Sequence, residues 1–255
     1  MKAFLRWVGL VLAAVLALQL FFVARIAATA VLDPQSTAFE RSEAWRVLSE
    51  KGTLRWRQQW VAYPEISDYL KRAVIASEDD GFAYHDGVDW DALEKAWQKN
   101  AKAEAQVAKF QATQTQNSKK TVAARNKPGV RQPKIVGGST ITQQLAKNLL
   151  LSGERTLLRK GQEFVLTLLL EGLLSKQRIL EIYLNNVEWG EGVFGAEAAA
   201  QHYFRKPASR LSAYEAARLA VMLPRPKYFE KIPNSSYIAG RASVIASRLS
   251  NAELP

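Results

Sequence analysis

The sequence contains no cysteine and only two histidines, and both shortages restrict the chemistry that the chain can perform. Without thiols it can form neither structural disulfides nor thiolate metal sites. His85 and His202 lie far apart in sequence, so a zinc site built on a histidine cluster is not expected. Convincing strand patterns are also scarce, and the sequence has no internal repeat.

Acidic residues are fewer than basic ones. The sequence has 24 Asp and Glu and 35 Lys and Arg, which gives a net charge of +11. A basic balance indicates an anionic partner, and charge alone leaves nucleic acid, anionic lipid and a phosphorylated substrate open. The 255 residues are 48% hydrophobic, enough for one sizeable core with appendages.

The N-terminus indicates the compartment. Residues 7–24 carry no charge and one weakly polar side chain, Gln19, and their length approaches the ~20 residues of a membrane-spanning helix. Lys2 and Arg6 precede this run, which predicts a cytoplasmic N-terminus and an exported remainder. A cleaved signal peptide is the competing interpretation, but the run exceeds the ~7–15 apolar residues of such signals. We therefore expect an anchor at residues 1–32, a juxtamembrane linker at 33–63 and a domain at 64–255.

Helical patterns dominate this domain, so the expected fold class is mainly α. Ile141, Leu145 and Leu149 form one apolar stripe. Two residue pairs have the spacing of a capping box, namely Thr140 with Gln143 and Ser212 with Glu215. Residues 190–195 match G-x-G-x-x-G without a βαβ unit, so we expect a tight loop and no dinucleotide site.

Two segments of the chain have unusual compositions. Residues 54–61 alternate cations with tryptophans, which suits either a lipid headgroup surface or packing on the domain. Residues 98–134 are rich in Ala, Gln, Lys, Thr and Asn. They predict a short helix continuing from Trp90 and then a mobile basic loop, hence a flexible insertion.

Three polar segments are candidates for chemistry. Residues 78–87 (EDDGFAYHDG) mix carboxylates with aromatics and glycines, and Glu78 ends an apolar helix, where burial would raise its pKa towards that of a general base. Residues 137–148 (GGSTITQQLAKN) place two glycines before a helix with a hydroxyl-rich first turn, which suits phosphate or sugar binding. Residues 159–163 (RKGQE) place Glu163 where a charged helix enters a core. The competing interpretations are a capped acidic loop, an ordinary N-cap and surface ion pairs.

Together these segments, followed by residues 175–185 (SKQRILEIYLN), resemble the four motifs of the family 51 peptidoglycan glycosyltransferases, in the same order. The similarity spans about residues 64–230. It is to the stand-alone, monofunctional members, because no S-x-x-K or K-T-G motif of a transpeptidase follows residue 230.

The resemblance implies a lysozyme-like helical large lobe with a smaller, membrane-facing lobe. It implies polymerisation of lipid II into β-1,4 glycan strands at the outer face of the inner membrane, with inversion and release of undecaprenyl diphosphate. Glu78 would be the general base, and Glu163 a second catalytic carboxylate near the diphosphate. A divalent cation, Mg²⁺ or Mn²⁺, is a candidate cofactor with Glu163 as its ligand. The implied substrate-binding residues are Asp79, Phe82, His85, Ser139, Thr140, Gln143, Gln144, Lys147, Asn148, Arg155, Arg159 and Lys160.

The implied partners are lipid II, the growing glycan chain and the membrane, with other cell-wall synthesis or division proteins as further candidates. A lysozyme-like peptidoglycan hydrolase is the alternative enzyme, because two carboxylates on a similar fold serve either reaction. It has little need for the anchor or the cationic face. A basic anchored scaffold or nucleic-acid-binding module is a third alternative, but the sequence carries no known nucleic-acid motif.

Overall fold

The computed structural model describes residues 1–118, 138–151 and 156–255, with side chains omitted at 109–118. The described chain forms two compact units, which are treated separately below. The first contains Met1–Val88 and Thr140–Pro255, and the second contains Asp89–Ser139.

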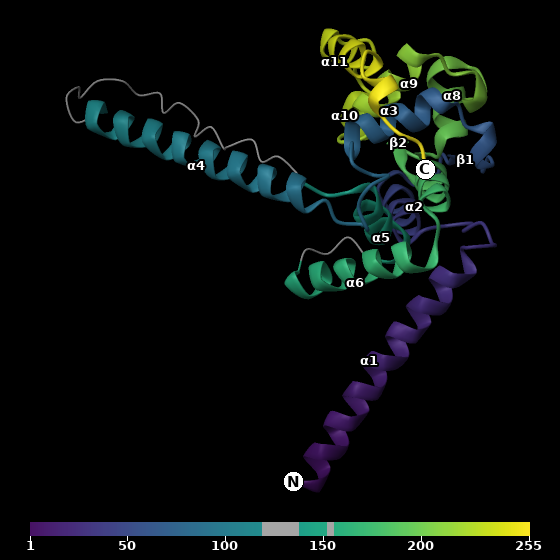
Figure 1. The fold of residues 1–255 in the computed structure, drawn as a ribbon, viewed down its shortest axis with the longest axis vertical. Helices are drawn as coiled ribbons and strands as arrows, with labels where there is room; N and C mark the ends of the chain where they lie inside the picture. The colour runs from purple at the N-terminus through teal and green to yellow at the C-terminus, as the bar shows by residue number, and fades with distance from the viewer. Residues whose placement is uncertain (119–137, 152–155) are drawn as a thin grey trace. The chain divides into compact units, whose positions relative to one another are not determined.

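The described residues are mainly helical, as the sequence predicts (Figure 1). In chain order the elements are α1 (Lys2–Ala28), α2 (Ala38–Lys51), β1 (Arg57–Gln58), η1 (Tyr63–Glu65), α3 (Asp68–Glu78), α4 (Trp90–Ser118), α5 (Ile141–Leu150), α6 (Leu157–Leu173), α7 (Lys176–Asn186), β2 (Glu188–Gly190), β3 (Val193–Phe194), α8 (Ala196–Phe204), η2 (Ala208–Arg210), α9 (Ala213–Met222), α10 (Pro226–Phe229), α11 (Ser236–Ala246) and η3 (Leu249–Asn251).

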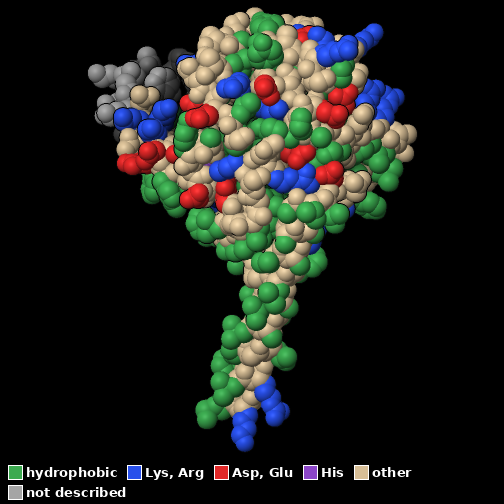
Figure 2. All heavy atoms as spheres, turned by 45° about the vertical axis from the view of Figure 1, so that its right-hand side comes forward, with side chains coloured by type: hydrophobic (Ala, Val, Ile, Leu, Met, Phe, Trp, Pro, Cys, Tyr) green, Lys and Arg blue, Asp and Glu red, His purple; other side chains and the backbone are tan. Residues whose placement is uncertain are grey.

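Helix α1 is the one helix of the described chain that is long and apolar enough to cross a membrane. Its side chains are almost all exposed, and Figure 2 shows apolar groups along its length and cations at its N-terminal end. Phe22 and Ile26, near its C-terminal end, are buried against the rest of the first unit. These features are consistent with a single-pass anchor.

The core of the first unit lies between helices α3, α5, α6, α7, α9 and α11. Ile141, Leu145 and Leu149 are almost fully buried, which confirms the predicted stripe of α5. Reciprocal side-chain to backbone bonds confirm both predicted capping boxes, at the start of α5 and at the start of α9.

A three-stranded sheet in the order β1-β3-β2 replaces what the sequence predicted as a simple loop between helices. Strand β1 is parallel and β2 antiparallel to β3. The tight turn is present: Gly192 and Gly195 have φ of 72° and 84°. Trp56 stacks on Phe194 with ring centroids 4.4 Å apart, so the tryptophan-rich segment packs on the domain.

The predicted linker contains α2 and β1. Thr37 caps α2, and the carboxylate of Glu40 accepts the Thr37 backbone N–H at 2.7 Å and the Gln58 amide at 3.0 Å. Burial raises the pKa of Glu40 to about 7, although these hydrogen bonds and nearby Arg41 lower it. The domain boundary at residue 64 stays a prediction.

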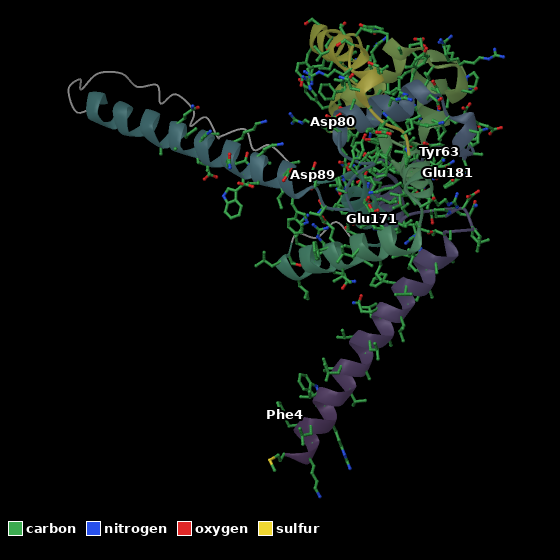
Figure 3. All side chains as sticks on the ribbon, viewed as in Figure 1. Phe4, Tyr63, Asp80, Asp89, Glu171 and Glu181 are labelled. Atoms are coloured by element: carbon green, nitrogen blue, oxygen red, sulfur yellow. The ribbon has the colours of Figure 1, made fainter. Side chains whose placement is uncertain are left out.

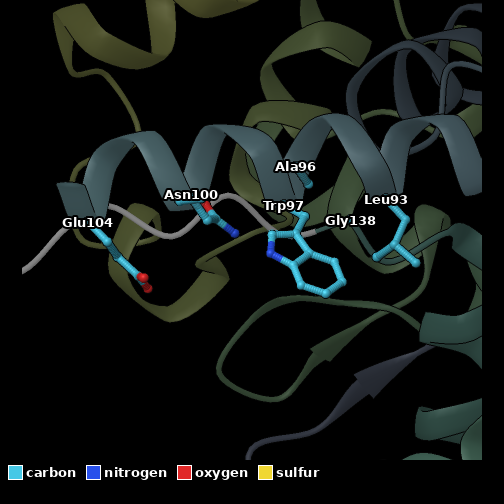
Figure 4. A pocket seen from close by; sticks show the side chains of 7 residues that line it. Leu93, Ala96, Trp97, Asn100, Glu104 and Gly138 are labelled. Atoms are coloured by element: carbon cyan, nitrogen blue, oxygen red, sulfur yellow. The ribbon is translucent and has the colours of Figure 1, made fainter. Parts of the chain in front are cut away.

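In the second unit the helix after Trp90 is longer than the short helix predicted, because α4 continues to Ser118. Its alanines, lysines and glutamines are strong helix formers, which the compositional argument for a loop overlooked. Trp97, Asn100 and Glu104 lie on one side of α4 and line a shallow hollow with Gly138 (Figure 4). Residues 119–137, which include the C-terminal part of the predicted insertion, lie outside the described chain.

Gly192→Ala tests the turn between β2 and β3. A Cβ there would lie 2.0 Å from the Arg55 carbonyl oxygen, and the φ of 72° already disfavours any side chain. We expect a loss of about 2 kcal/mol or more of unfolding free energy, read as a fall of several degrees in Tm. In Gly240→Ala of α11, where nothing lies within 4 Å of the added Cβ, Tm should rise slightly. Equal Tm values for the two variants would contradict this account.

Candidate active site

Glu78 is the last residue of α3, and its carboxylate is held by two other helices. The Nε2 of Gln144 on α5 donates to its Oε2 at 3.0 Å. The hydroxyl of Tyr183 on α7 donates to the Oε1 of Gln144, also at 3.0 Å. The amide is therefore fixed at both ends, with its donor directed at the carboxylate.

The surroundings of Glu78 suit a proton acceptor. Burial raises the pKa of Glu78 above its usual 4.5, the hydrogen bond from Gln144 lowers it, and the neighbouring charge of Asp79 raises it further. Burial raises the pKa of Tyr183 well above 10, with the charges of Glu78 and Asp79 adding to the effect, so its hydroxyl remains a donor. The partly buried carboxylate predicted from the sequence is confirmed, because Glu78 is half-buried.

Asp79 joins the first motif to the second. Its Oδ2 accepts the backbone N–H of Ile141, the first residue of α5, at 2.9 Å. Its Oδ1 lies 2.8 Å from the Nε2 of His85. The Nδ1 of His85 accepts the Gly87 N–H at 3.2 Å, so the proton of the neutral ring is on Nε2, directed at Asp79. Asp79 and His85 thus form the structural junction beside Glu78.

Thr140 and Gly87 reinforce this junction. The Thr140 hydroxyl donates to the Gly87 carbonyl at 2.6 Å while also capping α5. Gly87 has φ of 85°, and a Cβ there would lie 2.7 Å from Thr167 and 2.8 Å from Glu171, both on α6. The second glycine of the motif is therefore required by both backbone conformation and close packing.

Lys176 of α7 and Glu171 of α6 (labelled in Figure 3) support the loop of residues 79–87. Glu171 accepts from the Thr142 hydroxyl at 2.6 Å and from Lys176 at 2.8 Å. The same ammonium group donates to the His85 carbonyl and lies 4.6 Å from the centroid of the buried Phe82 ring. Phe82 is thus a packing residue of the loop.

Glu163 lies on α6 with its side chain 5% exposed. It forms ion pairs with Lys160 and, at 3.5 Å, with Arg159. The Nε of Arg159 is buried without a hydrogen-bond partner among the described residues. The ion pairs of the competing interpretation are present, although Glu163 itself is buried, and the role of these three side chains in binding stays a prediction.

Three other predicted site residues lie on α5. Gln143 uses its Oε1 to complete the cap of Thr140, Lys147 is exposed on α5, and Asn148 is half-buried. Ser139 belongs to the second unit, and Arg155 lies outside the described residues. Of the acidic segment, Asp80 (Figure 3) and Asp86 are exposed, so its carboxylates differ in their surroundings.

Sequence reasoning missed Tyr183, Lys176 and Glu171. Tyr183 and Lys176 fall within the fourth motif, but a tyrosine in an apolar helix is usually a core residue, and a lysine at a helix start is usually solvated. Spacing alone gives no signal for Glu171, because its partners come from α5 and α7.

The described residues do not fit a metal site at Glu163. Both of its oxygens already face cationic side chains. No group of three or more His, Cys, Asp or Glu side chains suited to a metal occurs in the described parts of the chain. We therefore assign no step to a protein-bound metal.

This arrangement, a half-buried carboxylate of raised pKa fixed by an amide, is one that can accept a proton from a hydroxyl group. The transglycosylase family model matches residues 46–127 and 108–250. The chain belongs to the transglycosylase family.

Its relatives are similar along almost their whole length. The biosynthetic peptidoglycan transglycosylase of Burkholderia thailandensis is 52% identical over 254 residues, which cover 98% of this chain and 88% of that protein. The protein of the same description from Burkholderia pseudomallei is 50% identical with the same coverage. That of Burkholderia orbicola is 50% identical over 240 residues, or 94% of this chain and 86% of the relative.

Gln144→Leu tests the link between the amide and Glu78. Because the Gln144 bond lowers the pKa of Glu78, its removal should raise that pKa further. A base must be deprotonated, so the acidic limb of the pH–rate profile for glycosyl transfer should move to higher pH. Gln201→Leu removes an amide that donates to Glu197 on α8, and it should leave the limb in place. An unmoved limb in Gln144→Leu would contradict the assignment.

Proposed function

We propose that this chain is a membrane-anchored peptidoglycan glycosyltransferase that polymerises lipid II into β-1,4 glycan strands, with Glu78 as its general base. Membership of the transglycosylase family and the relatives' description as biosynthetic peptidoglycan transglycosylases support the reaction. The observation that carries the assignment of the base is the half-buried Glu78 carboxylate, which is held by Gln144, whose amide is in turn held by Tyr183.

In the proposed reaction the 4-hydroxyl oxygen of the acceptor attacks the anomeric carbon of the donor. Glu78 takes the hydroxyl proton as the new C–O bond forms. The bond from the anomeric carbon to the diphosphate oxygen breaks, and its electron pair leaves with undecaprenyl diphosphate. The raised pKa of Glu78 makes its carboxylate a stronger proton acceptor than that of an exposed glutamate. This pKa is still lower than the pKa of a hydroxyl group.

The departing diphosphate requires positive charge nearby. Arg159 and Lys160 on α6 supply it, and Glu163 holds both in place. Among the described residues, the buried Nε of Arg159 has no hydrogen-bond partner. It is therefore available to donate to a phosphate oxygen of the substrate. Lys147 and Arg155 are further candidates for diphosphate contacts. Ser139, Gln143 and Gln144 are candidates for contacts with the sugars, and Asn148 for a further substrate contact. His85, Asp79 and Thr140 act by positioning the loop.

We infer the orientation of the anchor from the charges that flank α1, and the position of the smaller lobe from exposed apolar side chains of α6. Lys2 and Arg6 precede the apolar run of α1, which favours a cytoplasmic N-terminus and an extracytoplasmic domain. Leu157 and Leu158 of α6 are 93% and 86% exposed, which supports a membrane-facing smaller lobe at this helix. The helices around α3 and α9 would form the lysozyme-like large lobe.

The chain is proposed to consist of an anchor, a juxtamembrane segment and a catalytic domain. We place the anchor at residues 1–32, the juxtamembrane segment at 33–63 and the catalytic domain at 64–255. The family model matches as two segments, residues 46–127 and 108–250, that overlap within residues 98–134, where we place a flexible insertion. Lipid II, the growing glycan and the membrane are the proposed partners, together with other cell-wall synthesis or division proteins and without nucleic acid.

Glu78→Gln tests the base directly. The variant keeps the size of the side chain but cannot accept a proton, so polymerisation of labelled lipid II should fall by about 10²–10⁴. Asp80→Asn, an exposed carboxylate in the same motif, is the matched control and should polymerise at close to the parent rate. Failure of the parent to polymerise, with release of fragments from preformed peptidoglycan, would instead establish the hydrolase.

Glu163→Gln separates a positioning role from a metal-binding role. Loss of the negative charge frees Arg159 and Lys160 from their fixed geometry, so we expect polymerisation to fall about tenfold or more. The rate should stay low when Mg²⁺ or Mn²⁺ is titrated into the assay. Recovery to the parent rate at high divalent ion would show that Glu163 binds a metal and would refute the positioning role.

A further inference from the structure

Helix α1 contacts the domain along one face near its C-terminal end. Gln19, Phe22, Val23 and Ile26 recur at i, i+3, i+4 and i+7, and they are buried or half-buried, as is Arg25. The partner includes α6, which carries Glu163. The contact therefore joins the membrane anchor to the helix of the proposed diphosphate site.

Two side-chain amides form the polar part of this contact. The Gln19 Nε2 donates to the Gln162 Oε1 at 2.9 Å, and the Gln162 Nε2 donates back to the Gln19 Oε1 at 3.1 Å. Gln19 is the single polar residue within the apolar run of residues 7–24. In hydrocarbon an amide is costly unless it is paired, so this pair fixes which residue of α1 faces which residue of α6.

The position of Gln19 sets a depth. It lies six residues before Arg25, about 9 Å along a helix that rises 1.5 Å per residue. The pair therefore holds Gln162 about 9 Å along α1 from the level of Arg25, the first charged residue after the apolar run. Leu158 and Val165 share the helix face of Gln162 and are 86% and 42% exposed, as a lipid-immersed face requires.

We propose that Gln19 and Gln162 are a positioning pair that fixes the depth of α6, and with it the Arg159–Lys160–Glu163 group, relative to the membrane. The effect on activity rests on the proposed function, whereas the contact itself does not. A lipid-linked diphosphate lies at a depth set by the bilayer, so the cations that receive it must be held at a matching depth. The anchor would then be part of the substrate-binding geometry.

The contact is tested with paired cysteines in the full-length chain, which has no cysteine of its own. Gln19→Cys with Gln162→Cys, in vesicles of phosphatidylethanolamine and phosphatidylglycerol, should be linked efficiently by a short, reducible bifunctional thiol reagent. Ala17→Cys with Gln162→Cys is the matched control: Ala17 is exposed, about 200° around α1 from Gln19, and should not link. Equal linking of both pairs would overturn the contact.

The role in activity is tested by a double-mutant cycle on lipid II polymerisation in the same vesicles. Gln19→Leu and Gln162→Leu each leave one amide unpaired and should each lower kcat/KM about three- to tenfold. The double variant, which has no unpaired amide, should be no worse than either single variant, and the reducible link should restore the rate of the cysteine pair. Additive losses, or single variants with parent activity, would overturn the positioning role. An inactive parent would instead refute the proposed function.

Discussion

The rest of the site depends on the two interactions of the Asp79 carboxylate, with the N-terminus of α5 and with His85. One oxygen receives the first backbone N–H of α5 and the other faces the Nε2 of His85, so one side chain joins two motifs separated by 62 positions in sequence. A helix N-terminus favours a negative charge, and the bond satisfies a donor that the helix itself leaves unpaired. Without this junction, α5 would not present Gln144 to Glu78.

Local patterns predicted the elements and several of their details. The stripe of Ile141, Leu145 and Leu149, the cap formed by Thr140 and Gln143, and the burial of Glu78 follow from periodicity, capping chemistry and helix position, which act over a few residues. The family resemblance then related these segments to one reaction, which composition and spacing alone leave open between transfer and hydrolysis.

Tertiary partners were beyond the reach of those patterns. The bonds from Tyr183 to Gln144, from Thr142 to Glu171 and from Lys176 to His85 join residues 29 to 91 positions apart, and no short-range rule specifies them. The length of α4 was missed for a different reason: its polar, alanine-rich composition suits an exposed helix as well as a loop. In the sequence, Gln19 is a single polar residue in an apolar span and gives no signal of a contact. Its partner, Gln162 on α6, is identified only by the structure.

The buried Glu40 at the start of α2 makes the fold sensitive to the acidity of its surroundings. Its pKa is about 7 in the folded chain against 4.5 ordinarily, so between these values the native state retains a proton that the unfolded chain has released. The contribution of Glu40 to stability is therefore fully present in acid and declines as pH rises through this window. The proposed extracytoplasmic domain would meet the pH of the medium with little buffering. Mild acidification would thus stabilise the contacts of Glu40 with Thr37 and Gln58, and an alkaline medium would weaken them.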